Sequence, residues 1–189
     1  MINASADIGG LHLETERLII RPFKMEDLTD FNAYARVPGV GEWAGWSHHE
    51  SLEESRRILL CFIEGKKTLA LVNKATGQVI GSLGLENYRK NMDNLGFPPE
   101  AAGREIGYVL AKDFWGQGFM SEAVKAVIAY GFMTLHYDFF TCSHWVENIR
   151  SRRVIEKCGF TFVQEGECKT LMGEVRKTRD YIIFGSTQS

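Results

Sequence analysis

The stretch that decides the fold, Arg104 to Met133, reads REIGYVLAKDFWGQGFMSEAVKAVIAYGFM. Its first part, Glu105–Leu110, is rich in β-forming side chains and predicts a strand. The run Gly116–Gly118 can then turn the chain tightly and bring backbone close to a ligand, because glycine has no Cβ. From about Phe119 the apolar residues recur at helical spacing. This spacing predicts a helix whose buried face holds Val124, Val127, Ile128 and Gly131.

A glycine turn that leads into a helix N-terminus predicts an anion site, since free N–H groups and the positive end of the helix dipole converge there. Two known phosphate loops do not fit. A Walker loop needs Lys and then Ser or Thr after its last glycine, where Phe119-Met120 stand. The dinucleotide fingerprint asks for Gly or Ala at the position of Ser121 and for an acidic residue ending the next strand, whereas Asp138 precedes that strand. Local spacing also leaves open an ordinary strand-loop-helix corner with two flexible glycines.

The composition is that of a globular protein. The 189 residues suffice for one domain with a substantial core, and 44% of them are hydrophobic. A net charge of −2 argues against a large nucleic-acid footprint. We see no signal-peptide pattern and no apolar run of transmembrane length, so we expect a soluble cytoplasmic protein without a membrane partner. Neither zinc nor a disulfide framework is expected, because CxxC spacing is absent among Cys61, Cys142, Cys158 and Cys168.

Strands and helices mix along the chain without strict alternation, which predicts an α+β or mixed α/β class with one central sheet. We expect residues 1–12 to form a loose tail, residues 13–185 a single domain and residues 88–103 a linker. A capping box at Ser51–Glu54 predicts a helix that buries Leu52, Ile58, Leu59 and Phe62. Further strands are predicted over 17–23, 68–73, 79–87, 139–146, 160–165 and 181–184, and further helices over 25–36 and 148–158.

The segment 37–49, VPGVGEWAGWSHH, predicts an irregular loop with aromatic walls. Trp43 and Trp46 are candidates for a substrate pocket, since an indole face attracts an ammonium group and Glu42 adds a negative charge. Packing of both tryptophans on the core is the alternative.

Two motifs together carry a resemblance to a known family. EIGYVLAKDFWGQGFMSEAV, followed by VENIRSRRVIEKCGF, resembles the GNAT superfamily of acetyl-CoA-dependent N-acetyltransferases. The opening LETERLIIRPFKMEDL is similar to the RimJ/RimL-type branch, whose founding members acetylate protein N-termini. The resemblance spans Leu13 to Phe184. It implies the GNAT fold, a twisted, mostly antiparallel mixed sheet flanked by helices, with acetyl-CoA as cosubstrate, no metal, and a monomer or homodimer.

The resemblance also implies binding roles for matching residues. Tyr108, Val109 and Leu110 would pair their main chain with the pantetheine arm, and Asn148 would lie beside that arm and the reaction centre while also capping its helix. The loop that would cradle the coenzyme pyrophosphate through backbone N–H groups comprises Trp115, Gly116, Gln117, Gly118, Phe119 and Met120. Met120 is bulkier than the residue usual at its place.

The candidate catalytic residues come from comparing single positions with those of the family. Many family members use a Tyr as general acid where this chain has Ile155, so that route is closed. In the RimJ/RimL branch a Ser three residues after the Asn has this role, and Ser151 matches it. Glu105 is the candidate base, with a structural carboxylate paired to Arg104 or Arg153 as the alternative.

The resemblance implies acetyl transfer to a primary amine by direct attack in a ternary complex. At pH 7 about a tenth of α-amines are neutral, against about one lysine in 2,500. An N-terminal amine of a protein or peptide therefore asks least of a base, and it is the acceptor we expect. The alternatives are a small-molecule amine such as a polyamine, amino acid or antibiotic, or a non-catalytic acyl-CoA-binding sensor.

Overall fold

The strands of the protein form one sheet in the computed structural model, which describes residues 1–88 and 98–185. Their order is β2-β3-β4-β5-β6-β7-β9-β8, with β1 beside β6. Only the β1–β6 and β6–β7 pairs are parallel, so the predicted mixed and mostly antiparallel sheet is confirmed. The strands are β1 (Ile2–Asn3), β2 (Leu13–Glu14), β3 (Leu18–Pro22), β4 (Thr68–Asn73), β5 (Val79–Glu86), β6 (Ala102–Leu110), β7 (Phe139–Trp145), β8 (Thr161–Lys169) and β9 (Val175–Phe184).

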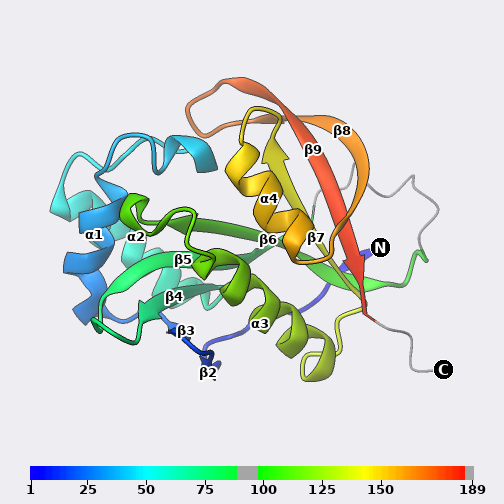
Figure 1. Cartoon of the computed structure of the whole chain (residues 1–189), viewed down its shortest axis with the longest axis horizontal. Coiled ribbons are helices and arrows are strands. Elements are labelled where there is room, and N and C mark those ends of the chain that lie inside the picture. The colour runs from blue at the N-terminus through cyan, green and yellow to red at the C-terminus, as the bar shows by residue number, and fades with distance from the viewer. Residues whose placement is uncertain (89–97, 186–189) are drawn as a thin grey trace.

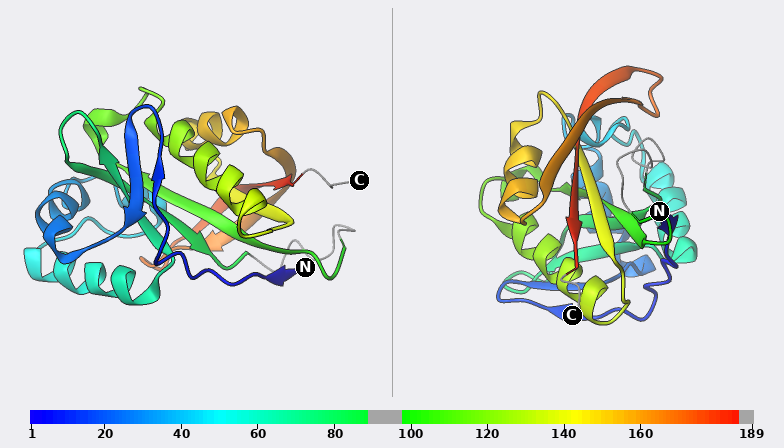
Figure 2. Two further views of the ribbon diagram at one scale, coloured as in Figure 1. Left: turned by 90° about the horizontal axis from the view of Figure 1, so that it is seen from below. Right: turned by 90° about the vertical axis from the view of Figure 1, so that its right-hand side faces the viewer.

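Helices cover both faces of this sheet (Figures 1 and 2). One face carries α3 and α4 over the larger core, and the other carries α1 and α2 over a second core. Their bounds are α1 (Leu28–Ala35), α2 (Leu52–Gly65), α3 (Phe119–Met133) and α4 (Ile149–Lys157). Short 3-10 turns occupy Met25–Asp27, Glu42–Ala44 and Lys112–Phe114. No helix within the described residues is long and apolar enough to cross a membrane.

The stretch quoted first folds as predicted. Strand β6 leads through a short 3-10 turn and the two glycines into α3, whose predicted buried residues Val124, Val127, Ile128 and Gly131 lie in the interior. Gly131 is needed there, because a Cβ would lie 2.2 Å from the ring of Phe140. The local sequence therefore positions the turn at one end of the sheet with a rigid helix behind it.

The capping box also forms, but one buried position was wrong. The Ser51 hydroxyl accepts a hydrogen bond from Glu54 N at 3.1 Å and starts α2. Leu59 is fully buried, whereas Leu52 is 54% exposed. Leu52 is the first residue of the helix and lies beyond the edge of the core that α2 covers.

Residues 1–12 do not form the expected loose tail. Ile2–Asn3 pairs with the start of β6, Ile8 and Leu11 are buried in the larger core, and the Tyr137 hydroxyl donates to Ser5 O. Burial of these two apolar side chains and satisfaction of backbone groups along β6 hold the segment in place.

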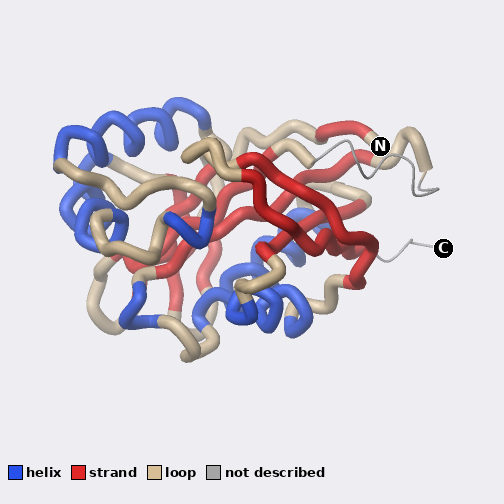
Figure 3. The backbone as a smooth tube through the Cα atoms, turned by 90° about the horizontal axis from the view of Figure 1, so that it is seen from above, coloured by secondary structure: helices blue, strands red, loops and turns tan. Residues whose placement is uncertain are grey.

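The chain departs from prediction at two further places. Most of the predicted linker 88–103 lies outside the described residues, and its last two residues begin β6. Strands β8 and β9 run longer than the predicted 160–165 and 181–184 and join through a turn near Gly173 (Figure 3). Most of their added residues are polar, including the buried Thr178 and Asp180, and polar residues give little apolar signal in a sequence.

Candidate functional site

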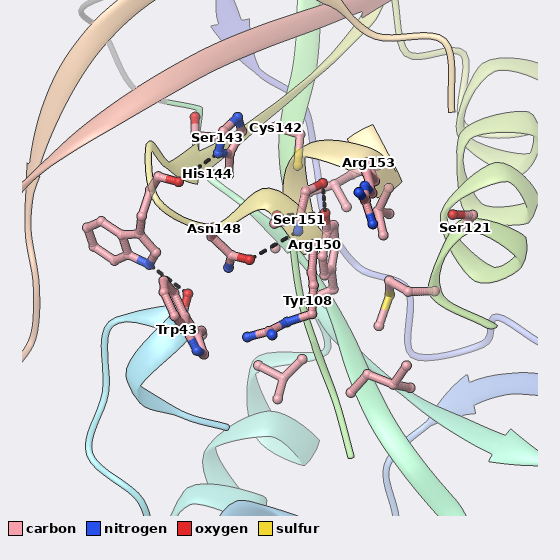
Figure 4. Close-up of a pocket in the computed structure, with 18 of the residues that line it drawn as sticks. Trp43, Tyr108, Ser121, Cys142, Ser143, His144, Asn148, Arg150, Ser151 and Arg153 are labelled. Atoms are coloured by element: carbon pink, nitrogen blue, oxygen red, sulfur yellow. Dashed lines mark hydrogen bonds between the residues drawn. The ribbon is translucent and has the colours of Figure 1, made fainter. Parts of the chain in front are cut away.

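The site begins where two neighbouring strands separate. Strand β6 pairs with β5 as far as Leu110, but it pairs with β7 only over Gly103–Glu105. Beyond Glu105 the two strands diverge, so the β7-facing edge of residues 106–110 has no strand partner within the described structure. Its main-chain groups line a cleft of about 510 Å³ (Figure 4). An extended chain could pair with this edge as an added strand.

The glycine turn closes one end of the cleft. Gly116 and Gly118 have φ of +76° and +86°, a left-handed conformation that residues with a Cβ rarely adopt. No side chain caps the N-terminus of α3, so the N–H groups of its first turn remain for a ligand. The turn is therefore tight and its helix start has no side-chain cap, while the anion cradle stays a prediction.

The residues assigned to this cradle divide between the cleft and the scaffold. Trp115, Gly116, Gly118 and Met120 line the cleft. Gln117 does not line it, and its carbonyl oxygen accepts from Arg17 Nη1 at 3.0 Å. Phe119 is 7% exposed beneath the Arg17 guanidinium, 4.2 Å from its ring centre. The Gln117 side chain donates from Nε2 to Asp113 O at 2.7 Å. Both side chains therefore support the turn, and the backbone N–H groups of these residues are left as possible donors.

Asn148 and Ser151 meet at the start of α4. The Asn148 side-chain oxygen accepts from Ser151 N at 3.1 Å, which confirms the predicted helix cap. The Ser151 hydroxyl lies 2.9 Å from the hydroxyl of Tyr108 on β6. All three residues line the cleft. Burial raises the pKa of Tyr108 well above its ordinary value, so the phenol stays protonated at neutral pH.

Glu105 lines the cleft at the point where β6 and β7 part. Its register partners are Glu86 on β5 and Thr141 on β7, so the three side chains point to one face of the sheet. Glu86 also lines the cleft, but its carboxylate is paired with Lys67 Nζ at 2.5 Å. Glu105 therefore lies where the free edge 106–110 begins, and its side chain is on the same side of the sheet as α1 and α2.

The loop 37–49 forms the opposite wall through Trp43. The Trp43 carbonyl oxygen accepts from Trp145 Nε1 at 2.6 Å, and the Gly45 carbonyl oxygen accepts from Leu171 N at 2.9 Å. These bonds hold the loop against β7 and the β8–β9 hairpin, which arches toward the loop in Figure 1.

Trp46 does not line the cleft. Its indole packs into the second core over Gly41, where a Cβ would lie 2.2 Å from the ring, and against the His49 ring at 5.1 Å. Glu42 is likewise turned inward to the loop and accepts from Gly39 N and from His48. Burial raises the Glu42 pKa, but these hydrogen bonds outweigh it and lower the pKa to about 2. Trp43 is thus the one residue named for the acceptor pocket that lines the cleft, together with Val40 and Ala44 of the same loop.

Sequence reasoning missed a row of cations on α4. Arg150, Arg153 and Lys157 line the cleft at i, i+3 and i+7 spacing, which is itself readable as one helix face. The Arg150 guanidinium lies 4.2 Å from the ring centre of Trp115 and 5.6 Å from that of Trp43. In Figure 4 Arg150 extends toward Trp43, whereas Arg153 lies on the side of Ser121. The cleft therefore combines a bare strand edge, an anion-binding turn and a cationic helix face.

Comparison with known proteins matches this geometry to one family. Residues 17–161 match the acetyltransferase (GNAT) domain family. The chain is 29% identical over 153 residues to the uncharacterized N-acetyltransferase p20 of Bacillus licheniformis, covering 78% of this chain and 81% of that protein. Among solved structures, a GNAT-family acetyltransferase from Bacillus anthracis superposes with a TM-score of 0.76 at 23% identity, over 92% of this chain and 98% of that one. A ribosomal-protein-S5-alanine acetyltransferase from Vibrio fischeri superposes with a TM-score of 0.71 at 20% identity, over 95% and 99%.

Proposed function

Because the chain belongs to the GNAT family of acetyltransferases, which take their acetyl group from acetyl-CoA, we propose that it acetylates the N-terminal α-amine of a protein or peptide. Attack is direct, with donor and acceptor bound together. The observation that carries this proposal is the strand edge at 106–110, which opens beside Glu105 and ends at the glycine turn.

The cleft fits the coenzyme part by part. The edge formed by Tyr108, Val109 and Leu110 offers backbone groups to the two amides of a pantetheine arm. The turn 115–120 offers free N–H groups to the pyrophosphate, and Arg153 and Lys157 add positive charge nearby. Asn148 orients the arm near the reaction centre through its amide group. When bound, acetyl-CoA supplies a thioester carbonyl and a thiolate leaving group.

Glu105 is proposed to take the proton from the acceptor amine, directly or through one water. The amine nitrogen forms a bond to the carbonyl carbon, and the C–S bond breaks. An α-amine has an ordinary pKa of about 8, so its deprotonation near neutral pH costs little free energy and asks little of the Glu105 carboxylate. A lysine acceptor would require several kcal/mol more at neutral pH.

Ser151 is proposed to give its proton to the departing sulfur. The Tyr108 hydroxyl lies within hydrogen-bonding distance of the Ser151 hydroxyl, and either oxygen can donate. When the phenol donates, the serine proton is left for the sulfur. Ile155, at the place where many family members carry a tyrosine acid, is 1% exposed in the larger core. A thiol has a pKa of about 8.5, so the thiolate leaves readily and the acid gives modest help.

Two other functions remain as alternatives, a small-molecule amine acetyltransferase and an acyl-CoA-binding sensor without turnover. A solved structure of similar fold is a ribosomal-protein-S5-alanine acetyltransferase, which supports the choice of a protein acceptor. The test measures thiol release from acetyl-CoA with peptides of varied first residue, polyamines, amino acids and aminoglycosides. Release with peptides supports the proposal, release only with small amines supports the first alternative, and binding without release supports the sensor.

A further inference from the structure

Arg150 bridges the two walls of the cleft. It is the second residue of α4, and its guanidinium lies near both the Trp115 indole of the coenzyme turn and the Trp43 indole of the 37–49 loop. Contact with aromatic faces holds the planar guanidinium without using its N–H donors. These two contacts orient an otherwise exposed side chain, and the donors at its edge stay open toward the cleft.

No carboxylate neutralises this guanidinium within the described part of the chain. No ion pair or hydrogen bond connects it to another described residue, whereas the neighbouring Arg152 is paired with Glu156 at 2.7 Å. A guanidinium presents a planar fork of donors that matches the two oxygens of a carboxylate. Arg150 also occupies the Trp43 face that an acceptor ammonium was expected to use. A second cation beside it would be repelled.

The position of Arg150 along α4 indicates which substrate carries the anion. At the far end of the cationic face the Cys158 thiol contacts Ser121 O at 3.6 Å, which brings the Lys157 end of α4 to the start of α3 and the coenzyme turn. Arg150 lies at the other end, beside the loop that is bonded to Trp145 and the β8–β9 hairpin. Arg153 and Lys157 therefore line the part of the cleft toward α3, whereas Arg150 lies between Trp115, at the start of the coenzyme turn, and Trp43 of the loop, where its donors can reach a group on the acceptor.

We propose that Arg150 binds a carboxylate that the acceptor carries close to its reacting amine, as an acidic side chain at the second or third residue of a peptide would provide. This inference rests on the proposed function and gives it a substrate class. Charge-assisted hydrogen bonds between the guanidinium and this carboxylate favour acidic acceptors over neutral or basic ones. The two indoles orient the guanidinium before the acceptor binds, which lowers the entropic cost of binding.

The test compares three peptides that differ only in carrying Asp, Gln or Lys at the second position. Wild type should prefer the Asp peptide over the Lys peptide by roughly tenfold to a hundredfold in kcat/KM. Arg150→Gln should remove this preference and Arg150→Glu should reverse it, while the KM for acetyl-CoA stays unchanged. Arg152→Gln is the matched control, because it removes the same charge from the same helix outside the cleft and should keep the wild-type preference. A further arm pairs free alanine with alaninamide, and a preference for the free acid that Arg150→Gln abolishes would assign the same carboxylate site to a small acceptor.

The outcomes separate this inference from the function on which it rests. Acetylation of all three peptides at similar rates by wild type would overturn the inference and leave the proposed function standing. A raised KM for acetyl-CoA in Arg150→Gln, with the peptide preference intact, would assign Arg150 to the coenzyme and overturn it too. Absence of acetylation of every acceptor tested would overturn both.

Discussion

The phenol oxygen of Tyr108 lies 2.9 Å from the hydroxyl oxygen of Ser151, which joins the separated strand β6 to the first turn of α4 across the cleft. Each residue alone has an ordinary structural role, one in a strand and one near a helix cap. Together they place two hydroxyl groups within hydrogen-bonding distance of each other, beside the edge where the thioester is proposed to lie.

Removing either hydroxyl should slow thiolate departure. Ser151→Ala should lower kcat by about tenfold, below the 10²–10⁴ typical of a full general acid, because the leaving group is mild. Tyr108→Phe keeps the ring and should lower kcat by less. Since the two act as one unit, the double variant should lose no more than Ser151→Ala alone. Steady-state rates of thiol release give the comparison, and strictly additive losses would show that the two hydroxyls act separately.

Glu105→Gln should lower kcat/KM for a peptide acceptor by about 10²–10⁴, the usual range for general acid–base help. The deficit should shrink as pH rises toward the pKa of the amine, because a neutral amine needs no base. Glu86→Gln is the control, since Glu86 lines the same cleft but is paired with Lys67. Rates that match wild type across about pH 6 to 9 would make Glu105 a structural carboxylate.

Gly118→Asp should abolish coenzyme A binding, since it adds strain at φ +86° and a negative charge to the anion cradle. Gly77→Asp is a matched control with φ +73° in the β4–β5 turn, away from the cleft. Both variants should lose similar stability, but only Gly118→Asp should lose affinity in calorimetric titration. Equal affinities of the two folded variants for coenzyme A would show that its phosphates bind elsewhere.

The two loop tryptophans should behave differently. Trp46→Ala removes a half-buried indole that packs against the second core and should cost about 3 kcal/mol of stability, the low end for such changes, with little change in acceptor KM. Trp43→Ala should raise the acceptor KM and lower the melting temperature less, since Trp43 lines the cleft. Melting temperatures and acceptor KM values for both variants test this, and the reverse pattern would assign the pocket wall to Trp46.

The resemblance to a family predicted the mixed, mostly antiparallel sheet, whereas the residue patterns themselves predicted local features. The glycine turn, the Ser51 and Asn148 caps and the buried face of α3 each follow from residues within a few positions of one another. The resemblance implied a free strand edge at Tyr108–Leu110, but residue patterns alone did not show the opening between β6 and β7, because it depends on where pairing between strands far apart in sequence ends. The same holds for the Tyr108–Ser151 contact and for Arg150 between two tryptophans, which only the folded chain brings together. The 37–49 loop shows the limit most clearly, since composition alone could not tell which tryptophan faces the cleft.

The central claim is acetyl transfer to an N-terminal amine, and one measurement tests it directly. A peptide with a free α-amine, an acidic second residue and an internal lysine is incubated with the protein and acetyl-CoA. Thiol release is then measured, and fragment mass spectrometry locates the acetyl group. We predict one acetyl group per released thiol, on the α-amine, with the lysine unmodified. Acetylation of the lysine alone, or thiol release without an acetylated peptide, would contradict it.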